Sequence, residues 1–149
     1  MLFLGEGCLS GFRFLEHMTD AEIEAYGMSL EQAFENAASA LEDTMVDIKS
    51  IQPELSEEII VEGEDKEALL YSWLEALIIK QDTENMLYSK FSCAISKTQK
   101  GYELRAKIFG EKFDPSKHEQ KTAVKAPTYH EMKIDEKQQQ VTLRFLLDL

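Results

Sequence analysis

Two segments of the chain repeat apolar residues at the spacing of an amphipathic helix. The first follows Ser29, which forms a capping-box pattern with Gln32, because these side chains can satisfy free backbone N–H groups at a helix start. Apolar residues then recur over about four turns, at Leu30, Ala33, Phe34, Ala37, Ala38, Leu41 and Met45. The second segment follows Asp65, with Glu67 in the first turn, where an acidic side chain is favourable. Its buried face is expected to hold Leu69, Leu70, Trp73, Leu74, Leu77 and Ile78.

Elsewhere apolar and polar residues alternate, which is typical of half-buried strands. Such runs occupy 12–14, 21–26, 58–62, 91–96, 102–108, 124–129, 132–134 and 141–147. Lys100-Gly101 lies between two of them and predicts a hairpin. Two helices with several hairpin strands predict an α+β fold. We expect a single-domain two-layer sandwich over residues 12–149, with a mixed, mostly antiparallel sheet and both amphipathic helices on one face. Residues 1–11 are expected to form a flexible leader or extension.

The composition is that of a globular domain without membrane spans. The chain has 149 residues, of which 44% are hydrophobic, and this is too apolar for a disordered chain. The longest apolar runs cover about four residues, far fewer than a bilayer-crossing helix needs. Cys8 and Cys93 make neither a disulfide framework nor a zinc-ligand spacing. Because the first residues also lack the basic start and long apolar stretch of a secretory leader, a cytoplasmic location is expected.

Charge is unevenly distributed along the chain. Sixteen basic and 28 acidic residues give a formal charge of −12, which argues against strong nucleic-acid binding by the whole surface. Residues 97–133, however, carry nine basic and five acidic side chains. This stretch is either a pair of strands with solvated lysines on the outer face, or a surface that faces a partner or a phosphate. The sequence leaves both interpretations open.

Few residues are typical of an enzyme active site. The three histidines are His17, His118 and His130, and none has a partner at i+3 or i+4 that would build a metal site on a helix. Asp20 follows His17 by three residues, but in a stretch predicted as strand and loop. No nucleophile elbow, phosphate-binding loop or Cys-x-x-Cys pair is present. Cys93 lies on the apolar side of its strand, where a thiol is unreactive. A hydrolase that uses His17 and Asp20 remains the enzymatic alternative.

Two aspartates lie where a carboxylate can bind a metal ion. Asp20 follows a break between two strands, and Asp148 interrupts the apolar end of the last strand, directly after Leu146-Leu147. A charge there needs water, a cation or hydrogen-bond donors close by. With the terminal carboxylate of Leu149 these groups would form an all-oxygen site, which suits calcium, magnesium or manganese.

Taken together, several sequence motifs resemble those of the archease family. They occur in the same order over nearly the whole chain, and the combination is far more specific than any one of them. The motifs are Phe14-Leu15-Glu16-His17-Met18-Thr19-Asp20, residues 25–35, residues 67–74, Gly110-Glu111 with Lys117-His118, Val124-Lys125-Ala126-Pro127-Thr128-Tyr129-His130, and Asp148-Leu149.

The resemblance implies an accessory protein and not an enzyme. Archeases assist the RtcB-type RNA ligase, which joins tRNA exon halves and repairs RNA with GTP and manganese. They promote guanylylation of the active-site histidine of the ligase and allow it to turn over repeatedly. As an alternative, the resemblance also implies a chaperone-like modulator of tRNA-modifying enzymes such as methyltransferases. The family fold is an α+β sandwich.

The resemblance also assigns roles to individual residues. The metal ligands would be Asp20, Asp148 and the terminal residue Leu149, with a divalent metal ion, either calcium, magnesium or manganese, as the cofactor. Lys125 would be a functional residue beside them, and His17 and His130 would support the site from the same motifs. The sequence departs from the family at Met18-Thr19, where archeases commonly have Thr-Ala, and at Pro127. Because proline cannot donate a ladder hydrogen bond, the strand there is expected to be an edge strand or bulged.

Overall fold

A computed structural model describes residues 2–3, 9–15 and 20–149, with side chains from residue 11 onward within these ranges. The elements in chain order are β1 (Leu2–Phe3), β2 (Leu9–Leu15), β3 (Asp20–Gly27), α1 (Leu30–Met45), η1 (Ile48–Ser50), β4 (Leu55–Gly63), α2 (Lys66–Glu84), β5 (Met86–Thr98), β6 (Gly101–Lys112), β7 (Ala126–Lys137) and β8 (Gln140–Asp148). In this part of the chain, no helix is long and apolar enough to cross a membrane.

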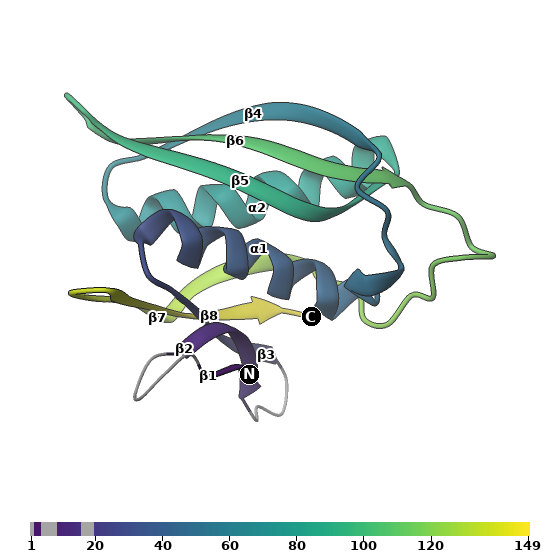
Figure 1. Ribbon diagram of the computed structural model, residues 1–149, viewed down its shortest axis with the longest axis horizontal. Helices are drawn as coiled ribbons and strands as arrows, with labels where there is room; N and C mark the ends of the chain where they lie inside the picture. The colour runs from purple at the N-terminus through teal and green to yellow at the C-terminus, as the bar shows by residue number, and fades with distance from the viewer. Residues whose placement is uncertain (1, 4–8, 16–19) are drawn as a thin grey trace.

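The two helices lie between two antiparallel sheets, so that the domain has three layers (Figure 1). One sheet has the strand order β1-β2-β3-β8-β7, and the other has the order β4-β6-β5. Helix α1 packs on β3 and β5, and α2 packs on β4 and β7, so each helix contacts both sheets.

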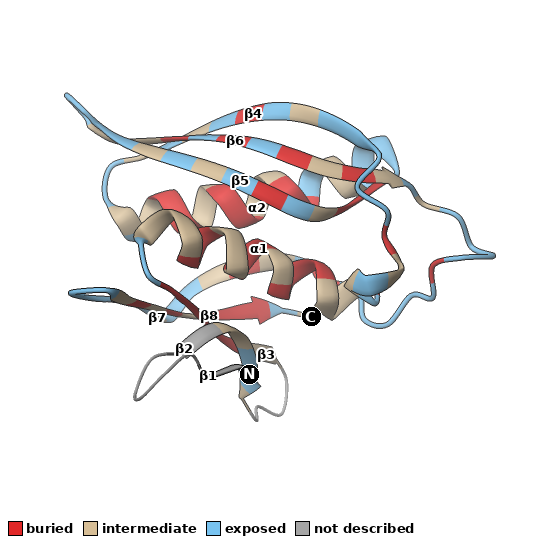
Figure 2. Ribbon diagram, viewed as in Figure 1, coloured by how far each residue is buried: buried red, intermediate tan, exposed pale blue. Residues whose placement is uncertain are grey.

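The α+β class and the two helices are confirmed, but the predicted single sheet in two layers is wrong. Alternation along a strand shows that one of its faces is buried, but it does not show what buries that face. Helix α1 buries more than one stripe, since Ala40 and Glu42 are enclosed in addition to five of the seven predicted positions, while Leu30 and Met45 are partly buried. That wide buried surface allows a sheet to pack on either side of the helix pair (Figure 2).

Both helices begin at the predicted caps. The Ser29 hydroxyl accepts a hydrogen bond from the Gln32 N–H at 3.1 Å, and the Gln32 side chain accepts one from the Met28 N–H at 2.6 Å. Asp65 accepts the Ala68 N–H at 2.7 Å. Trp73 lies fully buried where the two helices meet, and its indole N–H donates to the Phe34 carbonyl at 2.9 Å.

Strand β7, which contains Pro127, is an irregular edge strand. The two short runs predicted at 124–129 and 132–134 form one strand, and it lies at the edge of the five-stranded sheet. Its register with β8 shifts between Thr128 and Lys133. The prediction of an edge or bulged strand is therefore confirmed on both points.

The start of the chain differs in detail from the expectation. Strand β2 begins at Leu9, before the predicted start at Phe12, and residues Leu2–Phe3 pair with it as β1. Residues 1 and 4–8 lie outside the described part. The flexible leader at 1–11 therefore stays a prediction.

Candidate functional site

The register of the five-stranded sheet places Asp20 directly opposite Asp148. On the other side of β8, Ala126 is the register partner of Asp148, and the backbone N–H of the preceding Lys125 donates to the Asp148 carbonyl at 2.8 Å. Directly opposed residues of antiparallel strands share a face, with Cβ atoms about 5 Å apart. Three segments that are far apart in the sequence thus bring Asp20, Asp148 and Lys125 to one end of the sheet.

The two carboxylates lie at the surface, on a rigid support. Asp148 is exposed and Asp20 half-buried, whereas Leu146 and Leu147 just before Asp148 are buried. Leu149 packs partly against the core, which holds the last residue of the sequence close to β8. Two like charges opposite each other on a sheet are unfavourable unless a cation lies nearby.

The chemistry of these donors fits a hard divalent cation. Carboxylate oxygens are the ligands that calcium, magnesium and manganese prefer. Among residues 2–3, 9–15 and 20–149, however, no three His, Cys, Asp or Glu side chains form a group that could hold a metal ion. An ion at this end of the sheet would therefore also need the terminal carboxylate of Leu149, backbone oxygens or water.

The predicted histidines lie in three different settings. His17 lies outside the described residues, so its role stays a prediction. His130 is exposed in the segment of β7 where the register shifts, and its backbone N–H donates to Thr128 Oγ1 at 3.1 Å. It lies further along β7 than the Thr128–Leu146 pair, away from Asp148. The structure therefore does not bring His130 to the position opposite the two aspartates.

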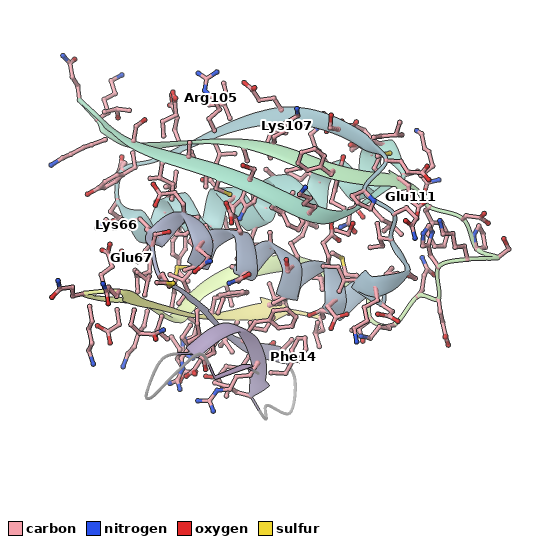
Figure 3. All side chains as sticks on the ribbon, in the orientation of Figure 1. Phe14, Lys66, Glu67, Arg105, Lys107 and Glu111 are labelled. Atoms are coloured by element: carbon pink, nitrogen blue, oxygen red, sulfur yellow. The ribbon has the colours of Figure 1, made fainter. Side chains whose placement is uncertain are left out.

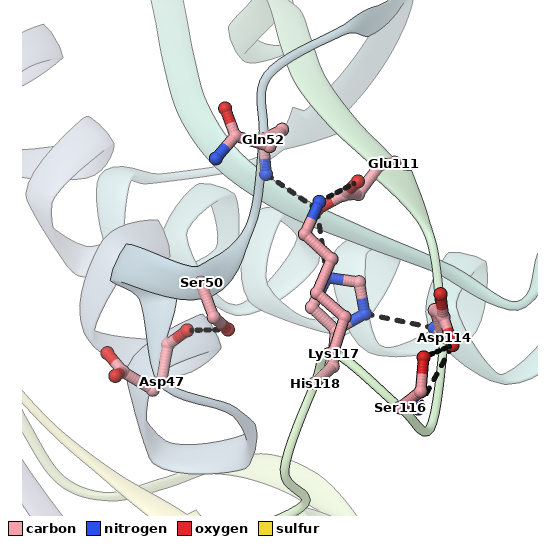
Figure 4. A network of polar contacts seen from close by, with 8 residues as sticks. All are labelled: Asp47, Ser50, Gln52, Glu111, Asp114, Ser116, Lys117 and His118. Atoms are coloured by element: carbon pink, nitrogen blue, oxygen red, sulfur yellow. Dashed lines mark hydrogen bonds and ion pairs between the residues drawn. The ribbon is translucent and has the colours of Figure 1, made fainter.

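His118 is buried and braces a loop (Figure 4). Its Nδ1 accepts the Asp114 N–H at 2.9 Å, so in the neutral ring Nε2 carries the proton and donates to Glu111 at 2.8 Å. Glu111 also accepts the Gln52 N–H and the Lys117 ammonium. Partial burial works to raise the pKa of Glu111, but these hydrogen bonds outweigh it and lower the pKa to about 2. The ring is buried and both nitrogens bond groups of the protein, so neither is exposed to a substrate.

A second polar cluster, which the sequence did not reveal, ties together the strands that carry the aspartates. Glu24 on β3 binds Arg144 on β8 at 2.8 Å and Arg13 on β2 at 2.8 Å. It also accepts the Tyr26 hydroxyl. Burial works to raise the pKa of Glu24, but these partners together lower it. The cluster stabilises the β3–β8 register that sets Asp20 opposite Asp148.

Two glutamates of α1 cap the outer edge of β5, and they too were missed. Glu42 is fully buried, accepts the Tyr88 N–H at 3.1 Å and contacts the Gln81 amide. Burial raises the pKa of Glu42 to about 8, although both hydrogen bonds oppose the shift. Glu35, two turns earlier, accepts the Cys93 N–H at 2.8 Å. The signal in the sequence was the spacing, because Glu42 lies four residues after Ala38 on the apolar stripe.

Cys93 and several basic residues of 97–133 lie beside acidic side chains. Burial and the nearby carboxylates of Glu35 and Glu31 raise the pKa of the Cys93 thiol, in agreement with an inert thiol. Basic residues of 97–133 are partly neutralised in place: Arg105 pairs with Glu58, Lys117 with Glu111 and Lys121 with Asp43. Arg105, Lys107 and Glu111 all lie on β6 (Figure 3). Both interpretations of the stretch therefore stay predictions.

The family model and the similar proteins all point to the same protein family. The model of the archease protein family matches residues 12–149. Protein archease of Sulfurisphaera tokodaii is 47% identical over 138 residues, covering 93% of this chain and 98% of that protein. Protein archease of Pyrococcus abyssi is 50% identical over 120 residues, covering 80% and 84% of the two chains.

Solved structures agree with these sequence matches. The solution structure of protein 1598 of Methanobacterium thermoautotrophicum superposes with a TM-score of 0.82 at 36% identity, covering 95% of this chain and all of that one. A crystal structure of an archease from Thermotoga maritima has a TM-score of 0.61 at 20% identity and covers 91% of this chain and 94% of that one. The second comparison shows the shared fold alone.

Proposed function

Because this chain belongs to the archease family, whose members are generally non-catalytic accessory proteins, we propose that it is a metal-binding factor that activates an RtcB-type RNA ligase. The observation that supports the proposal is the β3–β8 register, which sets Asp20 opposite Asp148. In this role the protein promotes guanylylation of the ligase histidine and its multiple turnover, in tRNA splicing and RNA repair. The ligase itself performs the chemistry.

Asp20, Asp148 and the terminal carboxylate of Leu149 would hold the divalent ion. When bound, the ion supplies a concentrated positive charge that neutralises the carboxylates and attracts phosphate oxygens. Lys125 is exposed and its backbone N–H bonds the Asp148 carbonyl, and the three donors of its ammonium suit a phosphate. The sheet contributes rigidity, since its register fixes both aspartates before any ion binds.

The expected partner is a protein and not RNA alone. A formal charge of −12 opposes strong phosphate binding by the surface as a whole. We therefore propose that this protein acts through direct contact with the ligase. We also propose that it does so in the cytoplasm.

The proposal is tested with limiting ligase, RNA ends, GTP and manganese, by counting ligation events per ligase molecule. Wild-type protein should convert a single turnover into many. Asp20→Asn and Asp148→Asn should each reduce this stimulation at least tenfold, because fewer charged oxygens bind the ion. Asp135→Asn is the matched control, since Asp135 is an exposed carboxylate of β7 paired with Lys137, away from Asp148.

Each failure has a separate meaning. Absence of stimulation by the wild-type protein would overturn the ligase role, and an effect on a tRNA methyltransferase instead would favour the chaperone-like alternative. Full stimulation by both aspartate variants, with circular dichroism unchanged, would overturn the metal assignment. Cleavage of RNA or phosphate esters by the protein alone would support the hydrolase hypothesis.

A further inference from the structure

A stacked pair of tyrosines, one exposed and one half-buried, lies outside the site described above. The rings of Tyr71 on α2 and Tyr129 on β7 are nearly parallel, with 5° between their planes and 4.4 Å between centroids. Tyr129 nevertheless remains 54% exposed. Because Tyr71 covers one face of the Tyr129 ring, the exposed part includes its opposite face.

The irregular part of β7 holds Tyr129 in this position. The register with β8 is lost between Thr128 and Lys133, and Glu131 within that segment has a positive φ of 57°. A bulge of this kind redirects side chains from their regular alternation. Tyr129 stacks on the helix, and Tyr71 supports its ring from beneath.

Acidic side chains surround this pair. Burial, Tyr71, and the charges of Asp65, Glu75 and Glu64 raise the pKa of Tyr129. Glu67 and Glu75 lie one turn to either side of Tyr71 on α2, so they share its face of the helix; Glu67 is at the start of α2 in Figure 3.

In the described part of the chain these acidic groups make no direct ion pair, although the charge of Lys66 interacts with that of Glu67. Lys66 is the nearest lysine in the sequence, and its ammonium pairs with Glu136 and lies 5.7 Å from the centre of the Tyr102 ring. Within the described residues, Glu64, Glu67 and Glu75 form no ion pair with a lysine or arginine. The surface combines an open aromatic face with carboxylates that form no direct ion pair, and Lys66 offsets part of the charge of Glu67.

We propose that the Tyr71–Tyr129 stack and the carboxylates of Glu64, Glu67 and Glu75 form a docking surface for an arginine side chain of the partner ligase. A guanidinium is planar and stacks on an aromatic ring, while its N–H groups reach neighbouring carboxylates. An RNA base could also stack on Tyr129, but its phosphates would be repelled by the surrounding acids. The inference rests on the proposed function and names the contact through which the protein recognises the ligase.

The location of the pair agrees with a single contact area. Tyr129 follows Ala126 by three residues, and Ala126 is the register partner of Asp148. At about 3.3 Å per residue, the tyrosine lies roughly 10 Å along β7 from the aspartate end of the sheet. An interface of standard size, about 800 Å² on each partner, covers both places at once.

The test measures the affinity of each variant for the ligase by calorimetry, beside its stimulation of the ligase. Tyr129→Ala should weaken binding about thirty-fold, as for a central interface aromatic, whereas Tyr129→Phe should stay close to wild type because the ring is retained. The double variant Glu67→Gln/Glu75→Gln should bind about tenfold more weakly and with less dependence on salt. Ile60→Ala is the control, since Ile60 is 48% exposed on β4 of the other sheet.

Tyr129→Ala that binds as tightly as wild type would overturn the docking surface, while the response of Asp148→Asn would still report on the proposed function. Loss of stimulation by Tyr129→Ala without loss of affinity would also overturn it, because the ring would then act in another way. Tight binding of RNA alone, abolished in Tyr129→Ala, would replace the arginine with a base. A wild-type protein that does not bind the ligase would remove the proposed function and this inference together.

Discussion

The buried carboxyl group of Glu42 should make the stability of this domain fall as the pH rises. Glu42 has no exposed surface and contacts the Gln81 amide and the Tyr88 N–H, with no cation among its hydrogen-bond partners. Burial raises its pKa from 4.5 to about 8. Glu42→Gln replaces the protonated carboxyl with a neutral group of nearly the same shape, which can still accept the Tyr88 N–H.

The magnitude follows from proton linkage. A carboxyl group whose pKa is raised in the folded state binds its proton more tightly there, so its favourable contribution is fully present below pH 4.5 and is lost as the pH rises toward 8. Within that window the free energy of unfolding falls by about 1.4 kcal/mol per pH unit. At pH 7 the loss amounts to about 3 kcal/mol, a large fraction of the stability of a domain this size.

Urea unfolding at pH 5, 6, 7 and 8 measures this effect. We expect Glu42→Gln to be more stable than wild type by about 3 kcal/mol at pH 7 and by less than about 1 kcal/mol at pH 5. Taking the difference at each pH removes the contributions of other titrating groups. Glu54→Gln, which changes an exposed loop carboxylate, should follow the wild-type curve. A difference between Glu42→Gln and wild type that stays constant from pH 5 to 8 would refute the reasoning.

Three further predictions concern the site and its surroundings. Lys125→Ala should reduce ligase stimulation at least tenfold while Lys125→Arg retains part of it, because a guanidinium copies an ammonium only approximately; full activity of Lys125→Ala would make the lysine a solvated surface residue. A peptide added after Leu149 should weaken calcium or manganese binding in a calorimetric titration, because it replaces the terminal carboxylate of Leu149 with a neutral carbonyl. Equal affinity of the extended and the unextended protein would exclude Leu149 as a ligand. Glu111→Gln should lower the free energy of unfolding by about 2 kcal/mol at pH 7, and this effect should disappear as the pH falls from 4.5 toward 2. The reason is that Glu111, with its lowered pKa, stabilises the fold only while its carboxylate is ionised. Identical urea unfolding of the two proteins at pH 7 would contradict this.

The local elements were predictable because their causes are local. Ser29 and Asp65 begin helices through hydrogen bonds to residues three positions later. The alternation in β3 and β8 reports which residues face the interior. Pro127 predicted an irregular edge strand because its missing N–H is a property of the residue itself.

The candidate site was predictable only as a set of residues. Motifs and the resemblance to archeases nominated Asp20, Asp148 and Lys125, but no pattern along the chain says which strand pairs with which. The β3–β8 register, stabilised by Glu24 with Arg13 and Arg144, is what brings the aspartates together. His130 shows the reverse case, since it shares a motif with Lys125 but lies further along β7 than the Thr128–Leu146 pair, in the segment without register partners on β8.

Long-range packing explains what sequence patterns did not reveal. The amphipathic spacing of apolar residues shows that one face of a helix or strand is buried. The same spacing is compatible with one sheet or with two, so the three-layer arrangement depends on how the helix pair packs against both sheets. Glu42 gains its raised pKa, and Tyr129 its stacked ring, from residues that are distant in the chain. The sequence by itself therefore determined the elements and the candidate residues through interactions over a few positions, whereas the contacts between distant strands and helices determined the layers, the paired carboxylates and the aromatic surface.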